Sequence, residues 1–381
     1  RAGRRVLVLE REPVPGGGLR SQASLFPGVR HDHCATVFAL ALASPFFREL
    51  GIQSALTWVE SPAVLAHPLG DGEVVLLWRD LGQTSEELGS DAGRYAALLR
   101  PLVAAGPELL ATVLGPAPGI YRFPGYRLPA AALVHFARAG LGPVTSLYRS
   151  FQTTRARALF AGLAAHSTLP LDRAPSAAFA LVLALCAHLT GWPLVRGGAV
   201  EFARWLVEQL EAAAGTLRCA YPVERLDDVP PARAIVLDLV PRAALALAHS
   251  RWPRWYRYQL QRYRPGPGVF TVDWLVRDGV PWRNERCRLA ATVHVGGSWA
   301  EIAAAERAVA QGRMPDRPFV ILVQPGRFDA SRARDGIEAV WGYCHVPAGW
   351  TGDATAAIEA QIERFAPGFR DRIVARRCWR P

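Results

Sequence analysis

The feature that most constrains the fold is the stretch of residues 5–21. An uninterrupted apolar run, residues 6–9, ends at Glu10, and three consecutive glycines follow at 16–18. A continuous Val and Leu run is typical of a parallel strand buried on both faces, and a carboxylate at its carboxyl end can accept hydrogen bonds from two ribose hydroxyls. The glycines allow the backbone to approach a pyrophosphate, because no Cβ intervenes. The stretch therefore predicts part of a doubly wound, dinucleotide-binding sheet.

The same stretch resembles the second strand and Gly-Gly turn of two-domain flavoproteins of the amine oxidase superfamily. Their shared pattern is an acidic residue, a glycine pair six and seven positions later, and Ser or Thr at the eleventh, which Glu10, Gly16, Gly17 and Ser21 match. The family has Arg after the glycine pair, where it reaches the FAD phosphates; here that residue is Gly18, and Arg20 is the candidate substitute. The resemblance implies FAD contacts from Glu10, Arg11, Gly16, Gly17, Gly18, Leu19, Arg20 and Ser21.

A second segment is similar to the family's other FAD contact. Gly197-Gly198 precedes a run with apolar residues at helical spacing, Gly215 is expected to follow the helix as its C′ residue, and strands are predicted at 216–223 and 234–238. The resemblance implies that the backbone of Val223 contacts adenine. An ordinary βαβ crossover would bury the same residues without a ligand.

From the resemblance we expect a mixed α/β and α+β fold. A Rossmann-like FAD-binding domain of the glutathione-reductase type, residues 1–50 and 194–250, would be interleaved with a helical and antiparallel-sheet substrate domain, residues 51–193 and 251–381. The family's G-x-G-x-x-G turn should precede the first strand by about twenty residues, and its Gly-rich closing stretch should follow Pro381. We therefore expect a fragment of a bacterial protein, truncated at both ends, that binds FAD poorly and is inactive.

Composition excludes some classes of function. All 44 basic residues are Arg, and the net charge is +11, but most of these Arg are scattered, whereas nucleic-acid binding needs a basic face. The six cysteines form no compact framework, which favours reduced thiols and a cytoplasmic location. No signal peptide is visible, and the longest apolar segment, 177–187, is too short to span a bilayer.

The middle and end of the chain predict helices and a sheet. Residues 64–69 and 74–78 flank a Gly-Asp-Gly turn and indicate a hairpin. Residues 158–166 and 177–188 carry almost no charge, which favours core helices over the lining of an apolar cavity. An antiparallel sheet is expected from segments 266–275, 292–297, 319–324 and 340–346.

Residues 251–264 interleave Arg with Trp and Tyr. Such a segment is compatible with a solvated helix that has one aromatic face in the core, which is the more common arrangement. The less common alternative is peripheral membrane contact, with aromatics at the headgroup level and Arg on phosphates.

Candidate substrate-cavity residues are His294, Tyr343 and His345, although a satisfied core His or Tyr is more common. Many relatives have Lys at the position of Thr271, where it could hold a water molecule near the flavin. The Thr at this position puts that chemical role in doubt here. The run of residues 31–34, His-Asp-His-Cys, has metal-ligand side chains, but adjacent residues of a strand point to opposite faces, so no metal is expected.

The resemblance to phytoene desaturase-like enzymes implies an FAD-dependent oxidoreductase that removes a hydride from a lipophilic, carotenoid- or isoprenoid-like substrate. Two alternatives stay open: an FAD-dependent amine oxidase, and a non-catalytic relative that binds a prenyl or lipid group, as Rab GDP-dissociation inhibitors do. The sequence assigns no catalytic residue, because the flavin itself carries hydride chemistry, and it leaves the oligomeric state open.

Overall fold

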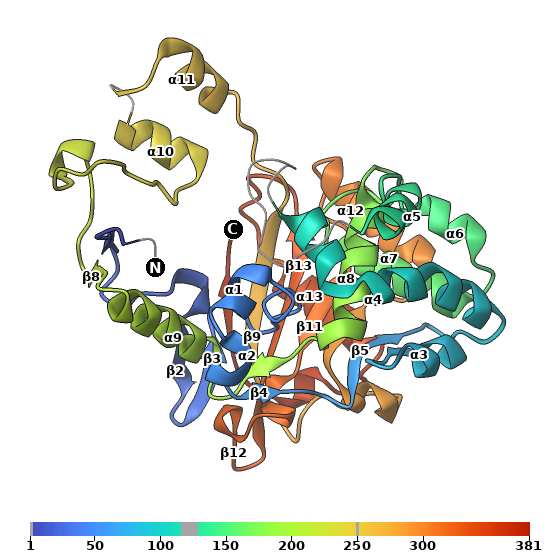
Figure 1. The fold of residues 1–381 in the computed structure, drawn as a ribbon. Helices are drawn as coiled ribbons and strands as arrows, with labels where there is room; N and C mark the ends of the chain where they lie inside the picture. The colour runs from blue at the N-terminus through green and yellow to red at the C-terminus, as the bar shows by residue number, and fades with distance from the viewer. Residues whose placement is uncertain (1–2, 116–128, 249–250) are drawn as a thin grey trace.

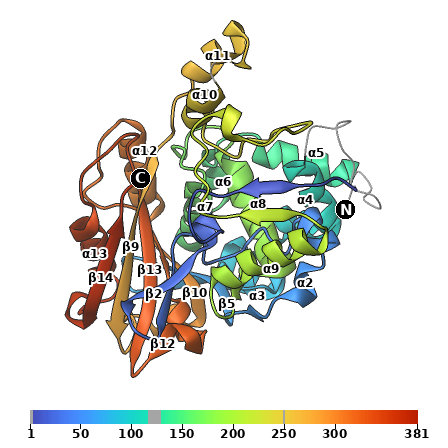
Figure 2. The same ribbon diagram turned by 90° about the vertical axis from the view of Figure 1, so that its left-hand side faces the viewer.

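The computed structural model describes residues 3–115, 129–248 and 251–381. Its largest element is an eight-stranded sheet (Figures 1 and 2). The strand order is β14 (Ile373–Trp379), β9 (Gly268–Arg277), β13 (Ile337–Val346), β11 (Val320–Val323), β10 (Ala290–Val295), β5 (Ala63–Pro68) and β6 (Val74–Leu77), with β12 (Ala333–Arg334) paired to β13. All four predicted sheet segments and the predicted hairpin are confirmed as strands. The predicted antiparallel sheet is confirmed for these four segments, which pair antiparallel with one another. Strand β10 also pairs with β5, in parallel, and thereby joins the hairpin to the sheet.

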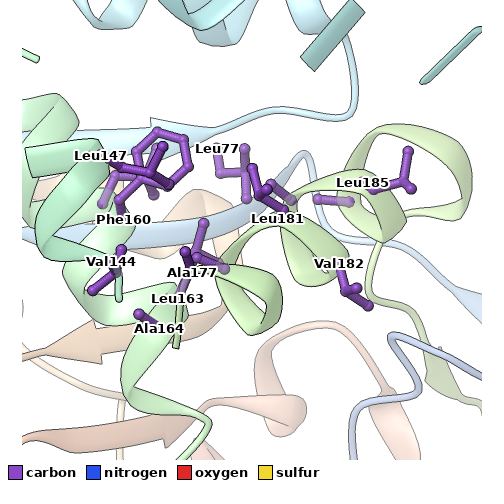
Figure 3. Packing of buried hydrophobic residues seen from close by; sticks show 14 of the residues in the cluster. Leu77, Val144, Leu147, Phe160, Leu163, Ala164, Ala177, Leu181, Val182 and Leu185 are labelled. Atoms are coloured by element: carbon purple, nitrogen blue, oxygen red, sulfur yellow. The ribbon is translucent and has the colours of Figure 1, made fainter. Parts of the chain in front are cut away.

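A layer of helices covers one face of this sheet. It contains α3 (Leu81–Glu87), α4 (Ala92–Leu114), α5 (Ala130–Gly140), α6 (Thr145–Ser150), α7 (Thr154–Ala165), α8 (Ser176–Thr190) and α12 (Trp299–Ala310). Every residue of α7 from Ala158 to Ala165 is buried, and α8 packs beside it in one apolar cluster (Figure 3). The uncharged helices are therefore core, as the sequence favoured. Helix α13 (Thr355–Glu363) packs in a second apolar cluster with β9.

One helical stretch among the described residues, Gly89–Leu114, is long and apolar enough to cross a membrane by length and composition. It is not a straight rod, because Gly106 has φ 44° and ψ −128° and divides it. Side chains such as Tyr95, Leu99 and Leu102 are buried in the apolar cluster around α8. One side of this helical stretch therefore packs on the apolar cluster.

The N-terminal residues build a smaller unit beside the sheet. Its elements are β1 (Leu7–Leu9), the 3₁₀ turn η1 (Gly17–Leu19), β2 (Ser21–Phe26), β3 (Val29–Asp32), α1 (Pro45–Glu49), α2 (Ile52–Ala55), β4 (Trp58–Val59), β7 (Leu194–Val195), α9 (Ala199–Ala212) and β8 (Thr216–Arg218). Strand β1 pairs with β8 in parallel, as a crossover through α9 requires. Val29 of β3 packs on Leu275 and Ala339, so the β2–β3 hairpin lies on the large sheet.

Several local predictions for this unit are wrong. Strand β1 is not buried: Val8 is 39% exposed, because among the described residues β1 pairs only with β8. The strand at 216–223 ends at Arg218, and 234–238 is neither helix nor strand, with Val236 92% exposed. At the end of α9 the left-handed residue is Ala214, φ 59°, rather than Gly215, whose missing side chain instead makes room for Leu210.

Helices α10 (Pro241–Ala248) and α11 (Arg254–Gln261) project away from the rest of the molecule (Figures 1 and 2). Helix α11 has no buried residue, and Trp255 is 68% exposed. The favoured interpretation, one aromatic face in the core, is therefore wrong. Arg262 instead donates a hydrogen bond to the hydroxyl of Tyr258, 2.6 Å away, on the outer surface.

Candidate functional site

The glycine turn packs closely between two other elements. Gly16 has φ 113°, which favours glycine, and a Cβ at this position would lie 3.0 Å from the Cβ of Ala203 on α9. A Cβ on Gly18 would lie 3.3 Å from the Cβ of Cys34, and the Ala35 amide donates to the Gly18 carbonyl at 2.9 Å. Side chains at Gly16 and Gly18 would therefore be crowded by these elements, whereas a Cβ on Gly17 would meet no described atom within 4 Å.

The predicted cofactor residues lie around this turn. Glu10 is half-buried and its Oε1 accepts a hydrogen bond from the Glu12 amide at 2.8 Å. The Tyr221 amide donates to the Glu10 carbonyl, 2.9 Å away, which brings the chain just before Val223 to the end of β1. Arg20 turns back on its own turn and donates from Nε to the Gly17 carbonyl at 3.0 Å. The side chains of two predicted cofactor residues point elsewhere. That of Arg11 is mostly exposed and pairs with Glu12, and that of Leu19 packs in the apolar cluster around Phe202.

Two side chains hold the N-terminus of α9 against the β2–β3 hairpin. Asp32 accepts hydrogen bonds from the Ser21 hydroxyl at 2.6 Å and from the Ala199 amide at 2.8 Å. Ser21 in turn accepts from the Val200 amide at 3.0 Å. These contacts satisfy helix amides that have no partner within the helix. In this structure, then, the Ser21 hydroxyl is a capping group.

Arg332 extends this network into the core. Its side chain is completely buried, forms an ion pair with Asp32, and donates from Nε to Asp329 at 3.3 Å and from a second nitrogen to the Val195 carbonyl at 3.3 Å. Asp329 also accepts from the Gly197 amide at 2.8 Å; burial opposes ionisation of Asp329, but its hydrogen bonds keep its pKa below the usual value. The guanidinium therefore joins three segments that are far apart in sequence, those of Asp32, Val195 and Asp329.

The sheet face beneath the N-terminal unit carries two neighbouring rows of side chains, many of which are polar. Strand register, together with the two-residue alternation of side chains, places the first row as Arg377, Asp273, Trp341, Val323, Thr292 and Leu65. The neighbouring row is Trp379, Thr271, Tyr343, Ile321 and His294, with His67 at its end.

Seven buried side-chain nitrogen or oxygen atoms have no hydrogen-bond partner in the part of the chain that the structure describes. Five of these atoms belong to the two rows: Asp273 Oδ1, Trp341 Nε1, Thr292 Oγ1, His67 Nδ1 and His294 Nδ1. The other two, His31 Nε2 and Thr36 Oγ1, belong to the N-terminal segment that lies over the sheet. Folded chains satisfy nearly all buried polar atoms, and those left over need a ligand or ordered water. Their concentration on one face marks it as the candidate site.

Asp273 is the most strongly perturbed carboxyl on this face. Burial raises its pKa to about 7, with a contribution from Asp32 in the same sense, although Trp379 Nε1 donates to its Oδ2 at 2.8 Å and Arg377 lies nearby. Above it, burial lowers the pKa of His31 to about 4. A carboxyl that titrates near neutral pH is a candidate proton-exchanging or hydrogen-bonding group for a ligand.

Replacing Asp273 with Asn is expected to stabilise the ligand-free chain at pH 8 by about 2–4 kcal/mol. The folded-state pKa of about 7 lies above the usual aspartate pKa of about 3.9, so the stability that this carboxyl contributes is present at low pH and is lost as pH rises through the folded-state pKa. Asn removes the ionisation and retains an acceptor for Trp379. Urea unfolding at pH 8 and pH 6 should show a gain about 1 kcal/mol larger at pH 8. Asp278→Asn, at an exposed position after β9, is the control, and an equal gain at both pH values would contradict the assignment.

Three histidines, the buried His67 and His294 and the half-buried His166, meet on the sheet face next to α7. His166 and His294 are hydrogen-bonded through their Nε2 atoms at 2.9 Å, and His67 Nε2 donates to the Gly297 carbonyl at 2.8 Å. Burial lowers the pKa of His166 to about 3 and of His67 to about 4, and lowers that of His294 well below its usual value. A Cβ on Gly162 would lie 2.5 Å from His294 Nδ1 and 3.0 Å from His67 Nδ1, so only glycine fits between them.

The other two predicted cavity residues lie on the same face. The rings of Tyr343 and His345 are 5.9 Å apart, and His345 Nδ1 lies 2.9 Å from a carboxylate oxygen of Glu306 on α12. The tyrosine's pKa is raised, first by burial and then by the charges of Glu306 and Cys34. Thr271 lies directly opposite Tyr343 on β9.

The structure thus brings His294, Tyr343 and His345 onto one face and places the glycine turn beside Cys34. Sequence reasoning missed Asp273, Arg332, Glu306 and the partners His67 and His166 of His294. The sequence offered one signal for Asp273. Period-2 alternation places Thr271 and Asp273 on one side of their strand, and Asp273 is the single acidic residue in that strand. The others depend on contacts between distant segments.

Among the described residues no group of three or more His, Cys, Asp or Glu side chains is arranged to hold a metal ion. In the predicted His-Asp-His-Cys run, Asp32 binds Arg332, and His33 packs edge-on against Trp379 with ring centroids 4.5 Å apart. Two surface hollows, of about 400 Å³ beside Trp78 and about 570 Å³ beside Pro101, lie in the helical layer and are lined by none of the predicted site residues.

Comparison with known families gives a match at the N-terminus. Residues 1–50 match the NAD(P)-binding Rossmann-like domain. This segment contains β1, Glu10 and the glycine turn. No curated protein sequence matches the chain significantly.

Solved structures share the whole fold at low sequence identity. An oxidoreductase from Methanosarcina mazei matches with a TM-score of 0.63 and 13% identity, covering 100% of this chain and 83% of its own. Cyclohexylamine oxidase from Brevibacterium oxydans matches with a TM-score of 0.54 and 17% identity, covering 99% and 79%. A Rab GDI from Plasmodium falciparum matches with a TM-score of 0.55 and 10% identity, covering 99% and 84%. The chain therefore has the mixed α/β fold with a Rossmann-like domain that the sequence predicted.

Proposed function

We propose that the protein is an FAD-dependent oxidoreductase of the phytoene desaturase-like type. The observation that carries this proposal is the unsatisfied polar face of the sheet, which lies directly under the segment that follows the glycine turn. A dinucleotide that extends from Glu10 over the turn would place its far end above this face. The Rossmann-like match at residues 1–50 and the oxidoreductases among the similar structures support the same conclusion.

Each part of the site has a role in this proposal. Glu10 accepts hydrogen bonds from ribose hydroxyls, the turn at Gly16 and Gly17 allows the pyrophosphate to approach, and the Val223 backbone contacts adenine. FAD, when bound, supplies the chemistry that accepts a hydride from carbon. The polar row at Asp273 and Trp341 orients the bound molecules, and the helical layer over the other half of the sheet excludes water.

For the substrate we propose a lipophilic molecule, carotenoid- or isoprenoid-like. The apolar packing of α7 and α8 beside His294 favours a hydrocarbon over a charged group. An amine substrate is the second candidate, because cyclohexylamine oxidase shares the fold. Hydrogen peroxide released from a panel of amines would establish the second candidate and reject the first. A non-catalytic lipid-binding role is the third, and absence of any bound flavin would favour it, given the Rab GDI match.

The visible absorption spectrum of the purified protein, recorded before and after addition of FAD, tests the cofactor directly. We expect a flavin spectrum. Glu10→Gln should weaken FAD binding by about 10- to 100-fold, because a hydrogen bond to a charged group contributes about 1.5–3 kcal/mol. Glu12→Gln, two residues away, is the matched control and should change affinity little. No flavin after FAD addition would reject the proposed function.

We further propose that the protein is cytoplasmic and that α10 and α11 contact the surface of a membrane with anionic lipids. Residues 239–272 contain six Arg and no Asp or Glu, so positive charge is concentrated there. The exposed Trp255 and Tyr258 on α11 suit the headgroup region, and Arg254 and Arg262 suit lipid phosphates. A lipophilic substrate would be taken up from such a surface.

Co-sedimentation with lipid vesicles tests this contact. We expect binding to vesicles that contain phosphatidylserine, weaker binding to neutral phosphatidylcholine vesicles, and loss of binding at high salt. The double variant Arg254→Gln/Arg262→Gln should bind about 30-fold less, since each Arg near an anionic surface contributes about 1 kcal/mol. Arg100→Gln/Arg149→Gln, exposed on α4 and α6, is the matched control. Equal loss in both double variants would show that net charge alone acts and would reject the specific surface.

A further inference from the structure

A buried carboxylate on α12 faces a buried imidazole on β13. Glu306 is 2% exposed and His345 is 3% exposed, and the two carboxylate oxygens lie 3.0 and 2.9 Å from the same ring nitrogen, Nδ1. A carboxylate can only accept a hydrogen bond, so Nδ1 carries the hydrogen. The other ring nitrogen, Nε2, then has a lone pair that is free to accept a proton.

This pair belongs to the sheet face that carries the candidate site. His345 is two residues from Tyr343 on β13 and therefore on the same side of the sheet. The rings of Tyr343 and His345 lie 5.9 Å apart. The pair therefore belongs to the row of side chains that contains Thr271 and Tyr343.

The titratable groups around His345 come from three elements. They are Glu306 on α12, Tyr343 on its own strand, and His166 on α7, whose pKa burial lowers and the charge of His345 lowers further. His166 and Tyr343 are neutral over the physiological pH range, because burial disfavours their charged forms. Among these neighbours Glu306 is therefore the group that can stabilise a positive charge on the ring.

We propose that His345 accepts a substrate proton at Nε2 and that Glu306 is the positioning residue that sets its tautomer and stabilises the imidazolium. This inference rests on the proposed function. One substrate C–H bond gives its hydride to a two-electron acceptor of the flavin class. The neighbouring C–H bond gives its proton to Nε2, and its electron pair forms the new C=C bond. With an amine substrate, the N–H bond supplies the proton and a C=N bond forms.

Nitrogen-15 NMR of histidine-labelled protein tests this assignment without a substrate. The His345 signals are identified by their absence in His345→Gln. We expect a protonated Nδ1 and a bare Nε2. A protonated Nε2 beside a bare Nδ1 would overturn the proposal, because Glu306 would then be the donor.

The positioning role is tested by Glu306→Gln. We expect this variant to lose the single tautomer and to populate the Nε2-protonated form, because a side-chain amide can donate as well as accept. The matched control is Glu301→Gln on the same helix, where Glu301 caps Ser298 and pairs with Arg364, and Gln also serves in a capping box. An unchanged tautomer in Glu306→Gln would overturn the positioning role. If Glu306→Gln does not fold, the wild-type spectrum alone still decides the tautomer.

These spectra do not need the cofactor, so the two proposals fail separately. The expected tautomer in a protein that cannot bind flavin would overturn the oxidoreductase function. A protonated Nε2 in a flavin-containing protein would overturn only the role of His345.

Discussion

Lowering the pH from about 7.5 to about 5 is expected to destabilise the folded chain by several kcal/mol and to cause unfolding with net proton uptake. The reason is a group of buried histidines. Burial lowers the pKa of His31 and His67 to about 4 and that of His166 to about 3. It also lowers the pKa of His294 well below its usual value. In the unfolded chain the pKa of each histidine is about 6.5.

The sign follows from where the protons bind. Between pH 6.5 and 4 the unfolded histidines are protonated and the folded ones are not, so full stability is present above 6.5 and is lost as pH falls. At pH 5 each histidine contributes a loss of about 2 kcal/mol, about 8 kcal/mol for four. Asp273 has the opposite effect, because it is protonated in the folded state at this pH. As pH falls it offsets about 2–3 kcal/mol of the loss of stability caused by the histidines. The remaining loss is comparable to the stability of a typical domain, about 5–15 kcal/mol.

Urea unfolding across this pH range measures the effect. At pH near 5.5 the slope should correspond to an uptake of about three protons, four from the histidines less one from Asp273. His67→Gln retains a donor for the Gly297 carbonyl and should reduce the uptake by about one proton. A pH-independent midpoint between pH 7 and 5 would show that these histidines are not held neutral in the folded chain.

Arg332→Met is expected to cost about 3–5 kcal/mol of stability. The guanidinium is completely buried between Asp32 and Asp329, and its removal leaves two buried carboxylates without their cation. Because Asp32 also caps α9 through the Ala199 amide, the loss should loosen the junction between this helix and the β2–β3 hairpin. Faster hydrogen exchange at Ala199 and Val200 would report that loosening alongside the urea midpoint.

The matched control is Arg334→Met on β12, where Arg334 pairs with Asp335 at an exposed position. Exposed ion pairs contribute about 0–1 kcal/mol, so this variant should unfold close to wild type. Adding Asp32→Asn to Arg332→Met should recover part of the loss, because it removes one of the two uncompensated charges. Equal effects of Arg332→Met and Arg334→Met would contradict a buried ionic junction.

Much of the site's framework was predictable because it depends on local pattern. The glycine turn beside Glu10, the helix after Gly198 and the hairpin around Asp71 follow from backbone freedom and hydrophobic period within short windows. The common face of Tyr343 and His345 follows from strand alternation. The roles of the predicted cofactor residues and the two-domain division stay predictions, because the fold alone does not test them.

The predictions that failed depended on what lies next to each segment. The apolar run at β1 was expected to be buried on both faces, yet burial of a strand depends on its neighbours, and among the described residues β1 has one. Residues 234–238 have a strand-like sequence but no strand beside them in the described structure, so their backbone forms no ladder. Helix α11 has an aromatic face, but no core lies within its reach.

By itself, the sequence determined the four segments of the antiparallel sheet, the hairpin at 64–78, the uncharged core helices and the glycine turn after Glu10, because these depend on spacing along the chain. Only the tertiary structure decided which polar groups meet. Arg332 and Asp32 are 300 positions apart, and His166 and His294 are 128 apart. No local period encodes such pairs, because they come together only when separate strands and helices pack on one sheet face and exclude water from it.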